Sequence, residues 1–242
     1  MTACPAWIRE QPIAHRGLHG PSGPENSIPA FEAAIAQEYA IELDIQRLAD
    51  GKLAVFHDKD LMRLTGEAGL VFEQTANSIQ QLTLLGTEHK VPLLEEVLTL
   101  IAGRVPVLVE IKNEGAVGPL EAELALVLSR YSGDCAIQAF NPKSLAWFKK
   151  HSPAIPRGQL ASNFEGDALG WPKKLLLSNL LMNWASSPQF IAYDLKALPT
   201  LPVTINARLF QLPIVAWTVR TEADCNQAER YADNIIFEGV RP

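Results

Sequence analysis

The stretch Ile41-Glu42-Leu43-Asp44-Ile45 alternates apolar residues with two carboxylates. Because successive side chains of a strand point to opposite faces, this alternation predicts a strand with Glu42 and Asp44 on one face. A second apolar run, residues 53–56, predicts another strand, which would place His57 at the same edge of the sheet as these carboxylates. Neighbouring carboxylates repel each other, and Ca²⁺ or Mg²⁺ favours such oxygen ligands. Taken alone, the pattern predicts either a cation site or the exposed polar face of an edge strand.

Apolar strands alternate with amphipathic helices along the chain. Strand patterns occupy residues 12–14, 40–46, 53–56, 106–111, 135–140, 158–161, 190–194, 214–219 and 234–237. Helix patterns occupy residues 27–37, 78–82, 94–102, 120–131, 142–151, 171–185, 201–210 and 222–231, the first with Ser27 as its N-cap. About eight of these nine strands alternate with helices, which predicts an α/β protein with a parallel sheet. Without a Gly-rich dinucleotide fingerprint, we favour a closed TIM (β/α)8 barrel over an open sheet.

Several residues suited to catalysis or binding occur at the predicted ends of strands, which form the functional face of such a barrel. They are His15, His57, Glu110, Lys112, Trp217 and Glu238. Two histidines, three carboxylates and flanking cations favour phosphodiester cleavage. A divalent cation on the carboxylates could act as Lewis acid, and basic side chains could offset the phosphate charge. One imidazole could accept a proton from the attacking hydroxyl while the other protonates the poor alcohol leaving group.

Composition narrows the class of protein. The chain has 242 residues with 48% apolar content, which suits one large domain or two small ones, and we expect a single domain over residues 1–242. With 21 basic and 27 acidic residues and no basic run, we expect no nucleic-acid partner. Three scattered cysteines indicate free thiols. We see no signal peptide, and no apolar run approaches the roughly 20 residues of a membrane span. We therefore expect a cytoplasmic protein without stable membrane insertion.

The sequence resembles the glycerophosphodiester phosphodiesterase family. The resemblance rests on Ala14-His15-Arg16-Gly17, Pro24-Glu25-Asn26-Ser27, Ile41–Ile45, Phe56-His57-Asp58, Val109-Glu110-Ile111-Lys112 and Ala216-Trp217-Thr218-Val219. It implies a TIM barrel with a small insertion after the second βα unit, which residues 58–90 match. It also implies hydrolysis of glycerophosphodiesters to sn-glycerol 3-phosphate and an alcohol, with a small-molecule substrate.

Site residues follow from the resemblance position by position. It implies His15 and His57 as the acid/base pair and one divalent ion, Mg²⁺ or Ca²⁺ with Mn²⁺ as an alternative. The implied metal ligands are Glu42, Asp44 and Glu110, the implied phosphate or substrate contacts are Arg16, Lys112 and Trp217, and Glu25 and Asn26 order the adjoining loop. Which histidine is the acid stays open, as do a cyclic intermediate against direct water attack and a monomer against a homodimer.

Two alternatives accompany this interpretation. The last strand ends in Phe237-Glu238, where relatives often carry Thr-Asp, so the alcohol side of the pocket could differ. A second enzymatic hypothesis is lysophospholipase D or sphingomyelinase D-like activity on acylated lipids. A non-enzymatic hypothesis is a barrel that binds phosphodiesters without cleaving them. Residues 171–184 also resemble a membrane-surface helix. We prefer a barrel helix there, because such helices pack an apolar face on the strands.

Overall fold

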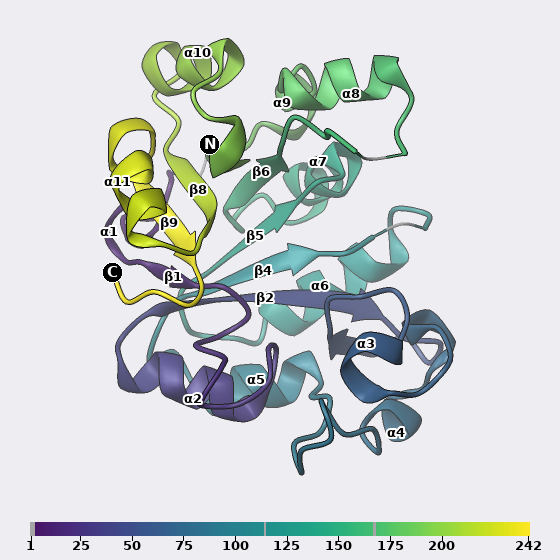
Figure 1. Ribbon diagram of the computed structural model, residues 1–242. Helices are drawn as coiled ribbons and strands as arrows, with labels where there is room; N and C mark the ends of the chain where they lie inside the picture. The colour runs from purple at the N-terminus through teal and green to yellow at the C-terminus, as the bar shows by residue number, and fades with distance from the viewer. Residues whose placement is uncertain (1–2, 114, 167) are drawn as a thin grey trace. The chain divides into compact units, whose positions relative to one another are not determined.

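The computed structural model describes residues 3–113, 115–166 and 168–242 (Figure 1). Strands and helices follow one another in the order of a TIM (β/α)8 barrel, with β3 as an additional strand, so the predicted fold class is confirmed. The chain forms two compact units. We call residues 14–135 the N-terminal unit, and residues 1–13 with 136–242 the C-terminal unit.

The strand β2 (Ala40–Arg47) organises the N-terminal unit. It pairs in parallel with β4 (Val107–Ile111), and Asp44 lies opposite Glu110 in this ladder. It also pairs antiparallel with β3 (Leu53–Val55), because the connection between them is a tight turn. The two-residue strand β1 (Ile13–Ala14) precedes them in the chain. Parallel pairing of β2 and β4 therefore brings carboxylates from two strands side by side.

Three helices of the N-terminal unit follow the predicted pattern: α2 (Ile28–Ala36), α5 (Leu94–Ile101) and α6 (Pro119–Leu128). Ser27 is the N-cap residue of α2, as predicted, but its side chain does not cap the helix. Its backbone lies at the N-cap of α2, but its hydroxyl donates to the Pro24 carbonyl at 2.6 Å instead of accepting from the helix. Ser27 therefore ties the preceding loop to the start of α2.

Residues 58–90 contain short helices: α3 (Met62–Thr65), η1 (Val71–Glu73) and α4 (Ala76–Ile79). The helix predicted over residues 78–82 begins earlier, because the Thr75 hydroxyl accepts from the Ser78 amide at 3.2 Å and fixes the first turn. Buried apolar side chains from this segment, including Leu61, Leu64 and Val71, pack with Phe56. The segment thus contributes to the packing behind the end of β3.

Five strands of the C-terminal unit pair in parallel, each with the next: β5 (Cys135–Ala139), β6 (Arg157–Ala161), β7 (Phe190–Asp194), β8 (Ile214–Val219) and β9 (Asn234–Phe237). The helical elements are α1 (Trp7–Glu10), α7 (Pro142–His151), η2 (Leu195–Ala197), α10 (Leu201–Leu209) and α11 (Glu222–Tyr231), apart from two described below. The sequence patterns did not predict α1. Gly158 is required in β6, because a Cβ there would lie 2.1 Å from the Phe190 ring.

The single helix predicted over residues 171–185 is two helices, α8 (Trp171–Ser178) and α9 (Asn183–Ser186). The Asn179 side chain donates to the Leu175 carbonyl at 2.8 Å, and Leu180 takes a positive φ of 57°, so the helix ends there. No residue of α8 is buried. The expectation that this helix packs an apolar face on the strands is therefore wrong.

Candidate active site

Three carboxylates of the N-terminal unit form a buried cluster. Glu42 and Asp44 point from one face of β2, and Glu110 from β4 beside them. Their exposed fractions are 1%, 1% and 6%, and one oxygen of each lies within 4.8 Å of the others. Glu42 Oε1 is buried and has no hydrogen-bond partner among the described residues. Hard cations bind carboxylate oxygens at this density, so the donor set fits a divalent ion.

The three carboxyl groups titrate very differently. Burial raises the pKa of Glu42 well above its usual range, and repulsion from Asp44 and Glu110 adds to this. Burial also raises the pKa of Glu110 to about 7, although Lys112 opposes the shift. Burial alone would raise the pKa of Asp44, but attraction to Lys112, His57, Arg16 and His15 lowers it below its usual range. A bound cation would favour the ionised form of all three.

Two basic side chains contact the cluster. Lys112 Nζ lies 3.2 Å from Asp44 Oδ1 and 2.5 Å from Glu110 Oε1. Arg16 Nε lies 3.3 Å from Asp44 Oδ2, and the Arg16 backbone amide donates to Glu42 Oε2 at 3.0 Å. When all three carboxyl groups are ionised, they and the two basic side chains carry a net charge of one negative unit. A bound divalent ion would therefore make the net charge of the cluster positive.

Asn26 contacts the cluster directly, which exceeds the loop-ordering role predicted for it. Its side-chain amide donates to Asp44 Oδ2 at 2.9 Å, and its backbone amide donates to the Arg16 carbonyl at 2.9 Å. Both Asn26 and Arg16 have positive φ, 53° and 55°. Asn tolerates this conformation better than most residues, so the loop places its amide where Asp44 needs a donor.

His57 follows β3 and keeps a defined orientation. Its Nδ1 lies 2.7 Å from Asp58 Oδ1, which favours the tautomer with a proton on Nδ1 and leaves Nε2 to act on a substrate. Burial lowers the pKa of His57, and the nearby Asp44 opposes the shift. His15 follows β1 and lies near enough to Asp44 to favour its negative charge. The structure therefore places both histidines by the carboxylates.

Asp58, the hydrogen-bond partner of His57, belongs to a network of charged side chains. Arg63 on α3 donates to Asp58 Oδ2 at 2.5 Å and to Glu25 Oε2 at 2.9 Å, and Arg16 Nη1 donates to Glu25 Oε1 at 2.6 Å. The hydrogen bond from Arg63 lowers the pKa of Asp58 to about 2. Sequence reasoning gave no role to Asp58 or Arg63. The available signal was the adjacency of Asp58 to His57 within one motif.

The remaining predicted residues lie in the C-terminal unit. Trp217 on β8 is half-buried and packs edge-to-face on Phe140, with ring centroids 5.7 Å apart. Its indole Nε1 is buried, and within the part of the chain that the structure describes it has no hydrogen-bond partner. Glu238 follows β9, and its Oε1 lies 2.5 Å from Arg220 Nε. The substrate role predicted for Trp217 therefore stays a prediction.

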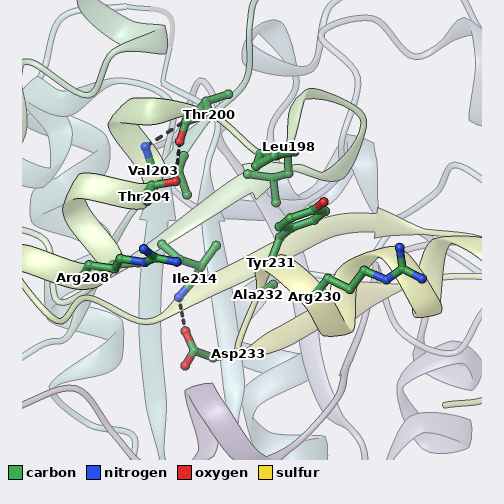
Figure 2. Close-up of a pocket in the computed structure, with 12 residues that line it drawn as sticks. Leu198, Thr200, Val203, Thr204, Arg208, Ile214, Arg230, Tyr231, Ala232 and Asp233 are labelled. Atoms are coloured by element: carbon green, nitrogen blue, oxygen red, sulfur yellow. Dashed lines mark hydrogen bonds between the residues drawn. The ribbon is translucent and has the colours of Figure 1, made fainter.

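A pocket of about 250 Å³ in the C-terminal unit is a weaker candidate (Figure 2). It lies between α10 and α11. Two of its polar side chains bond to the backbone: Thr200 accepts from the Val203 amide at 3.4 Å, and Asp233 accepts from the Ile214 amide at 2.8 Å. Such contacts hold elements together. The carboxylate cluster with its two histidines remains the better candidate site.

Comparisons with known proteins identify the family. Residues 15–238 match the model of the glycerophosphoryl diester phosphodiesterase family. The chain belongs to that family. This confirms the predicted family and the prediction that the protein is an enzyme, a phosphodiesterase.

Individual relatives agree. The chain is 28% identical to YhdW of Bacillus subtilis over 94% of its own length and 97% of that protein. It is 32% identical to a glycerophosphodiester phosphodiesterase of Bacillus altitudinis over 59% of this chain, which spans 63% of that relative. A phosphodiesterase of Oleispira antarctica, solved in complex with the product sn-glycerol 3-phosphate, shares the fold with a TM-score of 0.79. It is 22% identical and covers 94% of this chain and 92% of its own.

Among the described residues, no helix combines the length and the apolar character needed to cross a membrane.

Proposed function

We propose that the protein hydrolyses glycerophosphodiesters to sn-glycerol 3-phosphate and an alcohol, with a divalent cation and two histidines. One observation supports this above all: the buried cluster of Glu42, Asp44 and Glu110 lies by a histidine whose Nδ1 is engaged by Asp58. The product found in complex with the Oleispira antarctica phosphodiesterase, sn-glycerol 3-phosphate, supports the substrate class.

The three carboxylates would hold Mg²⁺ or Ca²⁺, with Mn²⁺ as an alternative. When bound, the cation supplies Lewis-acid polarisation of a phosphoryl oxygen. Arg16 and Lys112 touch the carboxylates of this cluster and would also neutralise the phosphate. Because Asn26 and the Arg16 amide already hold outer oxygens of Asp44 and Glu42, the remaining oxygens keep one orientation. This favours binding of the phosphodiester in a single pose.

His57 is the better candidate for the general base, and His15 for the general acid. The lowered pKa of His57 keeps its imidazole neutral near pH 7, as a base requires. Asp58 holds the Nδ1 proton and would stabilise the imidazolium that forms when Nε2 takes a proton from the attacking hydroxyl. His15 would then donate a proton to the leaving alkoxide.

The direct test is release of glycerol 3-phosphate from glycerophosphocholine and glycerophosphoethanolamine by the purified protein. The protein is treated with EDTA, and Mg²⁺, Ca²⁺ or Mn²⁺ is then restored. Metal-dependent release would support the proposal. Preference for lysophosphatidylcholine would favour the acylated-lipid alternative. Binding of phosphate ligands without turnover under any metal would favour a non-catalytic barrel.

A further inference from the structure

Many large apolar side chains are exposed on three helices of the C-terminal unit. These helices are α8, α9 and α10, and they lie together (Figure 1). Their exposed large apolar side chains are Trp171, Leu175, Leu176, Leu181, Trp184, Leu201, Ile205 and Leu209, with Phe210 directly after α10. Trp171 and Trp184 are each 77% exposed. We call these residues the α8–α10 face. Contiguous apolar patches on a protein surface usually mark a site of interaction.

A groove of about 880 Å³ runs through the α8–α10 face. Leu181 and Trp184 line it from the side of α9, and Leu201, Ile205 and Phe210 line it from the side of α10. The described residues that line it include no Asp or Glu. The groove could therefore accept apolar groups without burying a carboxylate.

Charge is distributed very unevenly along the chain. Residues 136–221 contain nine of its 21 Lys and Arg residues and only three of its 27 Asp and Glu residues. The rest of the chain contains 12 basic and 24 acidic residues, so this segment is cationic within an acidic protein. Lys173 and Lys174 lie in α8 between Trp171 and Leu175, and Arg208 lies in α10. Basic side chains thus flank the exposed apolar ones.

We propose that the α8–α10 face binds the surface of a bilayer that contains anionic phospholipids. A helix with Trp and Leu on one side and Lys at its margin lies in the plane of a membrane interface. Lys and Arg near an anionic leaflet add electrostatic attraction. The apolar groups enter the interface, the basic groups contact headgroup phosphates, and no segment crosses the bilayer.

Charge also argues against the main alternative, a dimer of two copies through this face. A symmetric dimer places the same patch of each copy against the other. Each copy would then present its basic groups to a patch with the same basic groups and no Asp or Glu among the described residues that line its groove, whereas an anionic surface complements them. The lack of buried residues in α8 fits a helix whose apolar side chains have their partner outside the chain.

Flotation with vesicles tests the proposal without any substrate. The full chain is incubated with phosphatidylcholine vesicles that contain an equal amount of phosphatidylglycerol, and with pure phosphatidylcholine vesicles. We expect binding to the anionic vesicles, a blue shift of tryptophan fluorescence, and weaker binding as salt rises. The variant Trp171→Ser/Trp184→Ser should lose binding by roughly tenfold or more, together with the blue shift.

A second variant tests charge separately. Lys173→Glu/Lys174→Glu should weaken binding to anionic vesicles by roughly tenfold or more, because each lysine near such a surface contributes separately. Arg130→Glu/Arg241→Glu makes the same change in charge at exposed positions elsewhere and should reduce binding much less. Phe72→Ser removes an aromatic ring that is 59% exposed in the N-terminal unit and should leave binding intact.

Several results would overturn the proposal. The wild-type chain could fail to float with anionic vesicles, float equally with neutral ones, or lose no binding in either α8 variant. A lipid-free dimer in sedimentation velocity that Trp171→Ser/Trp184→Ser converts to monomer would assign the face to self-association. Turnover of water-soluble glycerophosphocholine, measured on every variant, reports folding and tests the proposed activity independently.

Discussion

The carboxylate cluster and the α8–α10 face follow opposite structural rules. In the cluster, charged groups are buried, and hydrogen bonds or ion pairs hold nearly all of them, as with Asp44 between Asn26 and Lys112. On the α8–α10 face, large apolar groups are exposed and α8 contributes nothing to the core. Each arrangement costs folding free energy, which suggests that each is kept for a ligand. The cluster suits a compact anionic substrate with its cation, and the face suits an extended surface.

Removing a ligand from the cluster should have the largest effect. We expect Glu42→Gln to abolish metal-dependent release of glycerol 3-phosphate, because a cation would lose one of three carboxylates. The same change removes repulsion with Asp44 and Glu110, so the unfolding free energy of the metal-free protein should rise by about 0.5–2 kcal/mol. Turnover assays and thermal melts in EDTA measure both effects.

Glu32→Gln is the matched control, because Glu32 is an exposed carboxylate on α2. It should change neither turnover nor the melting temperature appreciably. A metal-free Glu42→Gln protein less stable than wild type would contradict the repulsion inferred among the three carboxylates.

Replacement of His57 should have the next largest effect. We expect His57→Ala to lower kcat by about 10²–10⁴-fold, the usual contribution of a positioned acid or base. The lowered pKa of His57 also predicts the pH profile. His57 can act as a base only when its imidazole is neutral. The rate of the wild type should therefore be maintained near pH 7 and should fall as the pH drops through the pKa of His57. This fall is the acidic limb of a bell-shaped pH profile.

His89→Ala serves as the control, since His89 belongs to the same unit but to no matched motif. It should keep the wild-type profile. Intact turnover in His57→Ala, or a monotonic pH profile in the wild type, would argue against the two-histidine mechanism.

Asp58→Asn should have an intermediate effect. Loss of a charged partner that orients a functional imidazole typically costs about 10–100-fold. Because the hydrogen bond to Asp58 raises the pKa of His57, its weakening should lower that pKa further and move the acidic limb to lower pH. Steady-state kinetics across pH measure both. Asp60→Asn, which alters an exposed acceptor for the Met62 amide, should leave the limb unmoved. An unchanged limb in Asp58→Asn would remove Asp58 from the proposed positioning role.

The smallest effect should come from the α8–α10 face. Leu175 is 52% exposed, so Leu175→Ala should change the unfolding free energy by no more than about 0.5 kcal/mol. Leu64→Ala makes the same chemical change at a side chain that is 1% exposed and should cost about 2–5 kcal/mol. Chemical denaturation of both variants compares them. A large loss for Leu175→Ala would mean that α8 contributes to the core after all.

Much of the site could be predicted from local pattern. Alternation along β2 predicted Glu42 and Asp44 on one face, and Glu110 and Lys112 were predicted at the end of the strand that follows in the barrel. These predictions succeed because a strand has a fixed period of two. The hydrogen bond from the Ser27 hydroxyl to the Pro24 carbonyl and the break after α8 were missed, since each depends on which of several nearby carbonyls one side chain bonds.

The sequence by itself determined the order of strands and helices, the family, and which carboxylates share a face. Only the tertiary structure decided that Asn26 contacts Asp44, that Arg63 joins Asp58 to Glu25, and that α8 lies outside the core. The physical reason is the distance along the sequence over which each interaction acts. Periodicity and capping act within a few residues, whereas burial and the pairing of charges distant in sequence depend on which elements the fold brings together.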